Sequence, residues 1–247
     1  MSIENERPGE ISQPLILAIE TATRSGSVAV TRGEQVLSAR VGDASISHST
    51  NLIEMIDAVL NEAKAELSDV DLFAVAVGPG SFTGLRIGLA TVKAFAAVTS
   101  HAIVGVSTLA AIAHAAEVEG LVVSLLPAGR GEVFAQSFSV RERQVIALDE
   151  ASHLSPAETW ERYGQMQELH WAGEGVQKLA DFREAISPET ALSGRMLAES
   201  VAALALKDFR EGKSVTADEL QAIYVRASDA EINEKWRLQN EQQSAQV

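Results

Sequence analysis

The stretch VAVGPGSFTGLRIGLA, residues 75–90, decides the fold of this chain. Its first residues complete an apolar run from Leu72 to Val77, which predicts a buried β-strand. The Gly-Pro-Gly sequence that follows allows a sharp reversal of the backbone. Ser81 is a favourable N-cap, so a helix is expected to begin at once. The sequence therefore predicts a strand, a tight turn and a helix as one continuous unit.

This unit has two interpretations, a phosphate-binding loop or a structural turn. Unpaired N–H groups at a glycine-rich turn and the helix dipole together attract anions. A Walker loop, however, needs a lysine at the turn. The first lysine after this turn is Lys93, about 18 Å along the helix axis from Ser81. The glycine spacing of a Rossmann fold is absent as well. The spacing therefore favours a structural turn whose glycines allow close packing of helix and strand.

The helix expected from Phe82 to Thr99 has more apolar surface than a single core covers. Its apolar arc spans roughly 220°, against roughly 100° for a helix that packs on one core. The helix expected from Ser47 to Lys64 has an arc of roughly 160°. We expect the excess at a subunit interface. The residues assigned to this interface are Leu52, Ile53, Met55, Ile56, Val59, Leu60, Gly84, Leu85, Gly88, Leu89, Ala90 and Ala94.

Composition excludes several functional classes. The chain has 247 residues, 46% of them hydrophobic, with a net charge of −14 and no cysteine. This charge argues against a principal role as a nucleic-acid clamp, and the lack of cysteine excludes disulfides and thiolate chemistry. Arg86, Lys93 and His101 interrupt the longest apolar region, and residues 1–13 have no apolar core of a signal peptide. A cytoplasmic protein that does not enter the membrane is expected.

A weak internal repeat predicts a duplicated α/β fold. Strands are expected at Leu15–Glu20, Gly26–Thr31 and Gln35–Val41, and a second meander at Leu121–Leu126 and Glu132–Val140. Helices follow each meander, which predicts two lobes. We assign residues 14–105 to an N-terminal lobe that carries the partner-binding helices, residues 106–228 to a C-terminal lobe, and residues 1–13 and 229–247 to flexible tails.

The residues that could carry chemistry do not form a complete active site. Glu20 ends the first strand, and an acid followed by hydroxyl residues in a hairpin is how sugar-kinase/actin-like folds hold a metal-bound phosphate. The second hairpin has no carboxylate before its turn at Pro127. His48 is interpreted as a helix-capping residue, and none of the five histidines forms a zinc-type pair. No catalytic or metal-binding residue is predicted, and the candidates for nucleotide contact are Glu20, Thr21, Ser81 and Arg130.

Several motifs together resemble one family. They are ILAIETAT at 16–23, His48, GPGSFTGLRIG at 78–88, RGEVF at 130–134, AGEG at 172–175 and YVR at 224–226. This set resembles the TsaB (YeaZ) family over roughly residues 14–235. The resemblance implies a duplicated sugar-kinase/actin-like (ribonuclease H-like) fold. It also implies a non-catalytic subunit that joins the paralogous enzyme TsaD and a TsaE-like ATPase to form N6-threonylcarbamoyladenosine on tRNA next to the anticodon.

The resemblance has further implications for ligands and partners. TsaD carries a pair of metal-binding histidines where this chain has Thr108 and Ile112, and this family usually has Asp where Glu20 stands and often Asp-Ala-Arg at residues 127–129. We therefore expect no cofactor of its own, with ATP or ADP at a complex interface. A homodimer is expected when the chain is alone, and tRNA contact only through the complex. The alternatives are an autonomous small-molecule kinase or peptidase of the same fold, and a purely structural homodimer.

Overall fold

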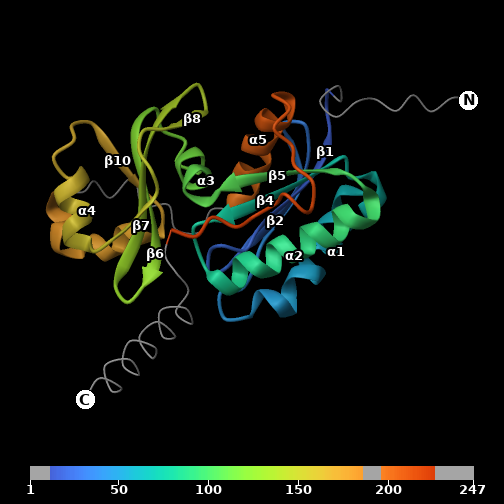
Figure 1. Ribbon diagram of the computed structural model, residues 1–247, viewed down its shortest axis with the longest axis horizontal. Coiled ribbons are helices and arrows are strands. Elements are labelled where there is room, and N and C mark those ends of the chain that lie inside the picture. Colours follow the sequence, from blue (N-terminus) through green and yellow to red (C-terminus); the bar gives the residue numbers. More distant parts are fainter. Residues whose placement is uncertain (1–11, 186–195, 226–247) are drawn as a thin grey trace, which may run out of the picture.

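The computed structural model describes residues 12–185 and 196–225, which form two lobes, each built on a five-stranded sheet (Figure 1). The residues expected to form flexible tails lie outside the described residues, apart from positions 12 and 13. The duplicated, two-lobed α/β fold expected from the sequence is confirmed.

The first sheet has the strand order β3-β2-β1-β4-β5. β1 pairs antiparallel with β2 and parallel with β4, which in turn pairs parallel with β5. The meander and central strand expected from the sequence are confirmed. The bounds of the five strands are Leu15–Glu20 (β1), Ser27–Arg32 (β2), Gln35–Val41 (β3), Leu72–Gly78 (β4) and Ala102–Ser107 (β5).

Helices cover both faces of the first sheet (Figure 1). α1 (His48–Ala63) and α2 (Phe82–Thr99) lie on one face, and α5 (Leu197–Arg210) lies on the other. β1 is buried along its whole length because alternate side chains enter the two cores. Leu15 and Leu17 pack with α1 and α2, whereas Ile16 packs with α5. The apolar run of β1 follows from this double coverage.

The second sheet has the order β10-β6-β7-β8, with β9 paired to β7. Its long central hairpin was expected, but the short strands β8 and β9 were not, because four and three residues carry too little periodic pattern. The elements outside the first sheet and its helices are η1 (Leu67–Asp69), α3 (Thr108–Ala115), β6 (Gly120–Gly129), β7 (Glu132–Arg141), β8 (Gln144–Ala147), β9 (Ser152–Leu154), α4 (Pro156–Tyr163), β10 (Leu169–Ala172) and η2 (Glu174–Ala185).

The lobe boundary does not follow chain order. Residues 106–228 were assigned to the C-terminal lobe, but α5 packs against β1, β2, β4 and β5 of the first sheet. Residues near Val215 and Ile223 return to the first lobe as well, where they bond to Ile103 and Val77. The physical reason is coverage: without α5, the second face of the first sheet would expose its apolar side chains to water.

The turn between β4 and α2 has the predicted form. The Ser81 side chain accepts a hydrogen bond from the Gly84 N–H at 3.2 Å, which confirms Ser81 as the N-cap. By length and composition α2 would suffice to cross a membrane, but it packs on β4 and buries one face in the core. Within α2, Gly84 and Gly88 lie directly against Thr21 of the β1–β2 turn.

Replacing Gly84 by alanine is expected to destabilise the protein by about 3 kcal/mol. The added Cβ would overlap the Thr21 carbonyl oxygen, a backbone atom that cannot move alone, and overpacking of this kind outweighs the gain of about 1 kcal/mol in helix propensity. Urea denaturation measures the change. Ala94→Ser, on the exposed face of the same helix, is the control and should cost less than about 0.5 kcal/mol. Equal stability of Gly84→Ala and wild type would contradict this packing.

Candidate functional site: the cleft between the lobes

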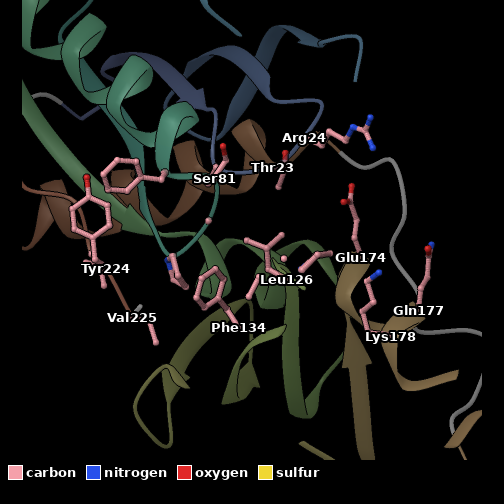
Figure 2. Close-up of a pocket in the computed structure, with 18 residues that line it drawn as sticks. Thr23, Arg24, Ser81, Leu126, Phe134, Glu174, Gln177, Lys178, Tyr224 and Val225 are labelled. Atoms are coloured by element: carbon pink, nitrogen blue, oxygen red, sulfur yellow. The ribbon is translucent and has the colours of Figure 1, made fainter. Parts of the chain in front are cut away.

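A cleft of about 660 Å³ lies between the two lobes (Figure 2). Thr23 and Ser81 reach it from the first lobe, and Leu126, Phe134 and Glu174 from the second. The full lining is Ala22, Thr23, Arg24, Pro79, Gly80, Ser81, Phe82, Leu126, Pro127, Ala128, Gly129, Phe134, Glu174, Gln177, Lys178, Ile223, Tyr224 and Val225. The site therefore draws on segments from both ends of the chain.

Glu20, the first candidate for nucleotide contact, does not line this cleft. Its side chain is 1% exposed and closes its own hairpin. The carboxylate accepts hydrogen bonds from the Thr23 N–H at 2.7 Å, the Thr23 hydroxyl at 2.8 Å and the Ser27 hydroxyl at 3.4 Å. Burial raises the pKa of Glu20, and the hydrogen bonds from Thr23 oppose that effect. The carboxylate is a structural acceptor within the turn.

Thr21 and Ser81 also have structural partners. The Thr21 hydroxyl is buried and donates to the Gly84 carbonyl at 2.8 Å, so it ties β1 to α2. Ser81 lines the cleft, but its hydroxyl caps α2, and its N–H donates to the Ala22 carbonyl at 2.8 Å. Of these two candidates, only Ser81 lies where a ligand in the cleft could reach it.

His48 has a different role from the one expected. The first turn of α1 has no side-chain cap; instead, His48 Nε2 donates to the Thr23 carbonyl at 2.9 Å. The ring also packs against Gly26, whose φ of +66° holds it in the left-handed region. The helix-capping interpretation was therefore wrong, since the side chain points back to the β1–β2 turn. That turn is held by α1, α2 and, through the Ala198 N–H to the Ser27 hydroxyl at 3.0 Å, by α5.

The β6–β7 hairpin of the second lobe forms one wall of the cleft and brings no carboxylate to it. Pro127, Ala128 and Gly129 line the cleft, while Arg130 lies exposed at the β6–β7 turn with a φ of +52° and is not part of the lining. Glu174, for which the sequence predicted no role, projects from η2 towards the β1–β2 turn (Figure 2). The sequence feature that could have indicated this residue is the AGEG motif at residues 172–175.

The fold family implies a metal-bound nucleotide in such a cleft, and the residues present do not fit one. Holding a metal–phosphate group needs oxygen ligands from both hairpins. In this chain Glu20 accepts hydrogen bonds within its own turn, and residues 126–129 of the second hairpin include no carboxylate. Among the described residues no group of three or more His, Asp or Glu could hold a metal ion.

One wall of the cleft is formed by the segment that ends the described chain. The Ile223 N–H donates to the Val77 carbonyl at 2.7 Å, which holds this segment against the end of β4. Tyr224 packs on Phe82 with ring centroids 5.2 Å apart, and the Arg86 guanidinium lies 3.8 Å from the Phe82 centroid. Phe82, just after the glycine turn, and Tyr224 thus meet here, although they are far apart in sequence.

The apolar residues assigned to an interface on α1 and α2 divide into two groups. Most are buried in the protein's own core, and for these the interface assignment was wrong, because the two helices use those positions to cover the first sheet. The buried group is Leu52, Ile56, Val59, Leu60, Gly84, Leu85, Gly88 and Leu89. The group left at the surface is Ile53, which is 58% exposed, Ala90 and Ala94, with Met55 partly buried.

An exposed apolar face nevertheless remains on α2. Thr83, Ala90, Ala94 and Ala97 are exposed and recur at helical spacing, so they share one side of the helix. Val98, at 84% exposure, extends this side towards the C-terminal end. A helix with an apolar outward face and a buried inward face is typical of a surface that another element covers.

A second hollow lies between α3 and α5, with a volume of about 1,020 Å³. His114 Nδ1 is 3.0 Å from the Ser200 hydroxyl there, the described arrangement nearest to a nucleophile and base. The two residues are 7% and 6% exposed, and burial lowers the pKa of His114. Such burial keeps a substrate carbonyl from the Ser200 oxygen, so the pair is a contact between two helices.

Comparisons with known proteins agree with this architecture. Residues 42–232 match the family described as TsaD, tRNA N6-adenosine threonylcarbamoyltransferase. The tRNA threonylcarbamoyladenosine biosynthesis protein TsaB of Escherichia coli is 30% identical over 222 residues, which cover 85% of this chain and 94% of that protein. TsaB of Bacillus subtilis is 31% identical over 48% of this chain and 52% of that protein.

Solved structures of YeaZ proteins have the same fold. YeaZ from Pseudomonas aeruginosa superimposes with a TM-score of 0.73 at 26% identity, covering 85% of this chain and 99% of YeaZ. A protein from the same organism, described as similar to peptidase YeaZ, gives a TM-score of 0.74 at 25% identity, with 86% and 100% of the two chains covered. The chain therefore belongs to the TsaB (YeaZ) family, within the wider family that the TsaD model describes.

Proposed function

We propose that this chain is a non-catalytic subunit that supports a TsaD-related enzyme in forming N6-threonylcarbamoyladenosine on tRNA next to the anticodon. The observation that carries this proposal is the outward apolar face of α2, which covers no part of the chain's own core. Membership of the TsaB family supports the choice of partner, because a TsaB relative is named for threonylcarbamoyladenosine biosynthesis and the family model is that of the transferase.

The docking face, as we call the exposed sides of α1 and α2 around Ile53, Ala90 and Ala94, suits a helical partner. Small side chains allow a helix to approach closely, and Ile53 supplies apolar bulk beside them. TsaD-related proteins share the duplicated fold and hence present similar helices. We propose that the same face pairs with a second copy of this chain when the partner subunit is absent.

The cleft supports the non-catalytic part of the proposal. Glu20 is held inside its own turn, and residues 126–129 of the second hairpin include no carboxylate. We therefore propose that the chain binds no cofactor of its own and that ATP or ADP binds at the interface with partner subunits. A TsaE-like ATPase is the further partner we expect. With a charge of −14, the chain meets tRNA only within the complex, in the cytoplasm.

Ala94→Arg is expected to weaken binding of the TsaD protein from the same organism by at least about 30-fold. The charge would be buried without a partner on the docking face, which costs roughly 2–5 kcal/mol. Isothermal titration of the full chain with TsaD measures the change. The matched control is Ala157→Arg, at an exposed position of α4, which should bind as wild type does. If Ala94→Arg and Ala157→Arg both bind TsaD as tightly as wild type does, the docking face is not the surface that binds TsaD.

The isolated chain is expected to hydrolyse ATP no faster than a protein-free blank, with or without magnesium. The reason is that its two hairpins supply no pair of acids for a metal–phosphate group. Release of inorganic phosphate is the measurement. Turnover that disappears in Ser81→Ala, a change at the exposed cleft residue, would instead show that the cleft is an active site and would support the autonomous kinase.

Glu20→Gln is expected to change how stability depends on pH. Because the folded pKa of Glu20 is raised, the native state keeps its proton in a range where the unfolded state has lost it. The stability of wild type should therefore fall, relative to Glu20→Gln, as pH rises from the ordinary Glu pKa through the raised one, by up to about 1.4 kcal/mol per pH unit. Urea denaturation over a pH series tests this. If the difference in unfolding free energy between the two proteins stays constant over the pH series, the raised pKa of the buried Glu20 carboxyl is contradicted.

A further inference from the structure

Charged side chains divide the docking face into two halves of opposite sign. α1 exposes Glu54 and Asp57. α2 carries Arg86 and Lys93 and has no carboxylate along its whole length. In a chain with a net charge of −14, a helix whose charged residues are all positive departs from the rest of the molecule. Within the described residues, neither Lys93 nor the two α1 acids form an ion pair.

The two positive residues lie along the edge of α2 that is far from α1. Gly84 marks the near edge, since a Cβ there would lie 3.2 Å from His48 Cδ2 of α1. At about 100° per residue, Arg86 and Lys93 are about 160° and about 180° around the helix from Gly84. The Arg86 guanidinium is held over the Phe82 ring, which fixes its position. The positive charge therefore forms a row at the outer edge of the face.

The negative half belongs to α1. The third acid of that helix, Glu62, is already paired with Arg40 of β3, on the side of α1 away from α2. Glu54 and Asp57 are exposed between that side and α2. Across the docking face, the sign of charge thus changes from negative on α1 to positive at the far edge of α2.

This polarity distinguishes the ways in which a second copy could cover the face. α1 and α2 run in the same direction, because each leads from the end of one strand to the start of the next parallel strand. A two-fold axis along the helices places α1 of each copy over α2 of the other. An axis across the helices places α1 on α1 and α2 on α2. The first arrangement pairs opposite charges twice, whereas the second sets like charges together.

We propose that Arg86 and Lys93, with Glu54 and Asp57, select the first arrangement, so that a second copy docks with its acidic α1 over the basic α2. This inference rests on the docking face proposed above and adds the determinants of orientation. The same charges require a partner helix that meets α2 to carry acids along its edge. The apolar residues supply contact area. The charges set the register and disfavour the second arrangement, in which the two-fold axis runs across the helices.

A charge-swap experiment tests the proposal with the full chain alone. The all-acidic variant carries Arg86→Glu and Lys93→Glu, and the all-basic variant carries Glu54→Lys and Asp57→Lys. Each alone should self-associate at least about tenfold more weakly than wild type at about 0.05 M salt, and an equal mixture of the two should recover association. Raising salt to about 0.5 M should weaken wild type and strengthen each variant. Analytical ultracentrifugation measures all of these constants.

Two controls carry the same changes in net charge on the second lobe, Arg141→Glu with Arg143→Glu, and Glu161→Lys with Glu168→Lys, all at exposed positions. They should associate as wild type does. Equal association of wild type and both swap variants, or a mixture no tighter than either variant alone, overturns the charge inference and leaves the docking face in place. A wild-type chain that stays monomeric at every concentration overturns both this inference and the self-association proposed above.

Discussion

The close approach of α2 to the β1–β2 turn is the contact on which the rest of the structure depends. A Cβ at Gly84 or Gly88 would overlap Thr21, so only glycine allows the helix to lie this near the turn. The Thr21 hydroxyl then reaches the Gly84 carbonyl at 2.8 Å, and His48 fixes the turn from the side of α1. The glycines were predicted to serve close packing, and that interpretation is confirmed.

This contact also determines which side of α2 is left outside. A wide apolar arc indicated two covered sides, but a helical wheel alone does not say which side faces the sheet. The glycine edge is the inner one because it must meet Thr21, and Leu85, Leu89 and Val92 follow it into the core. For this reason eight of the residues predicted at the interface lie in the core, whereas Ala90 and Ala94 from the same prediction are exposed.

The candidate site shows a different limit of sequence reasoning. The hairpin acid was found from the sequence, since Glu20 ends a buried strand before hydroxyl residues. Whether such an acid faces a cleft or its own turn depends on a rotamer and on the reach of Thr23 and Ser27, which spacing does not encode. Its near-complete burial becomes clear only once α5 is seen to lie against the same turn, through the bond between Ala198 and Ser27. That packing joins residues 171 positions apart.

Net charge and local charge act on the chain over different distances. Two copies that each carry −14 repel one another at long range, although salt limits this repulsion to within about 10 Å. Stable contact therefore requires a surface on which the local field differs from the overall one, and α2 provides it, because Arg86 and Lys93 are its two charged residues. The glycines that turn one edge of α2 towards the β1–β2 turn place these two residues on the opposite edge. The packing of the core and the polarity of the docking face thus have a common origin in the spacing of residues 84–93.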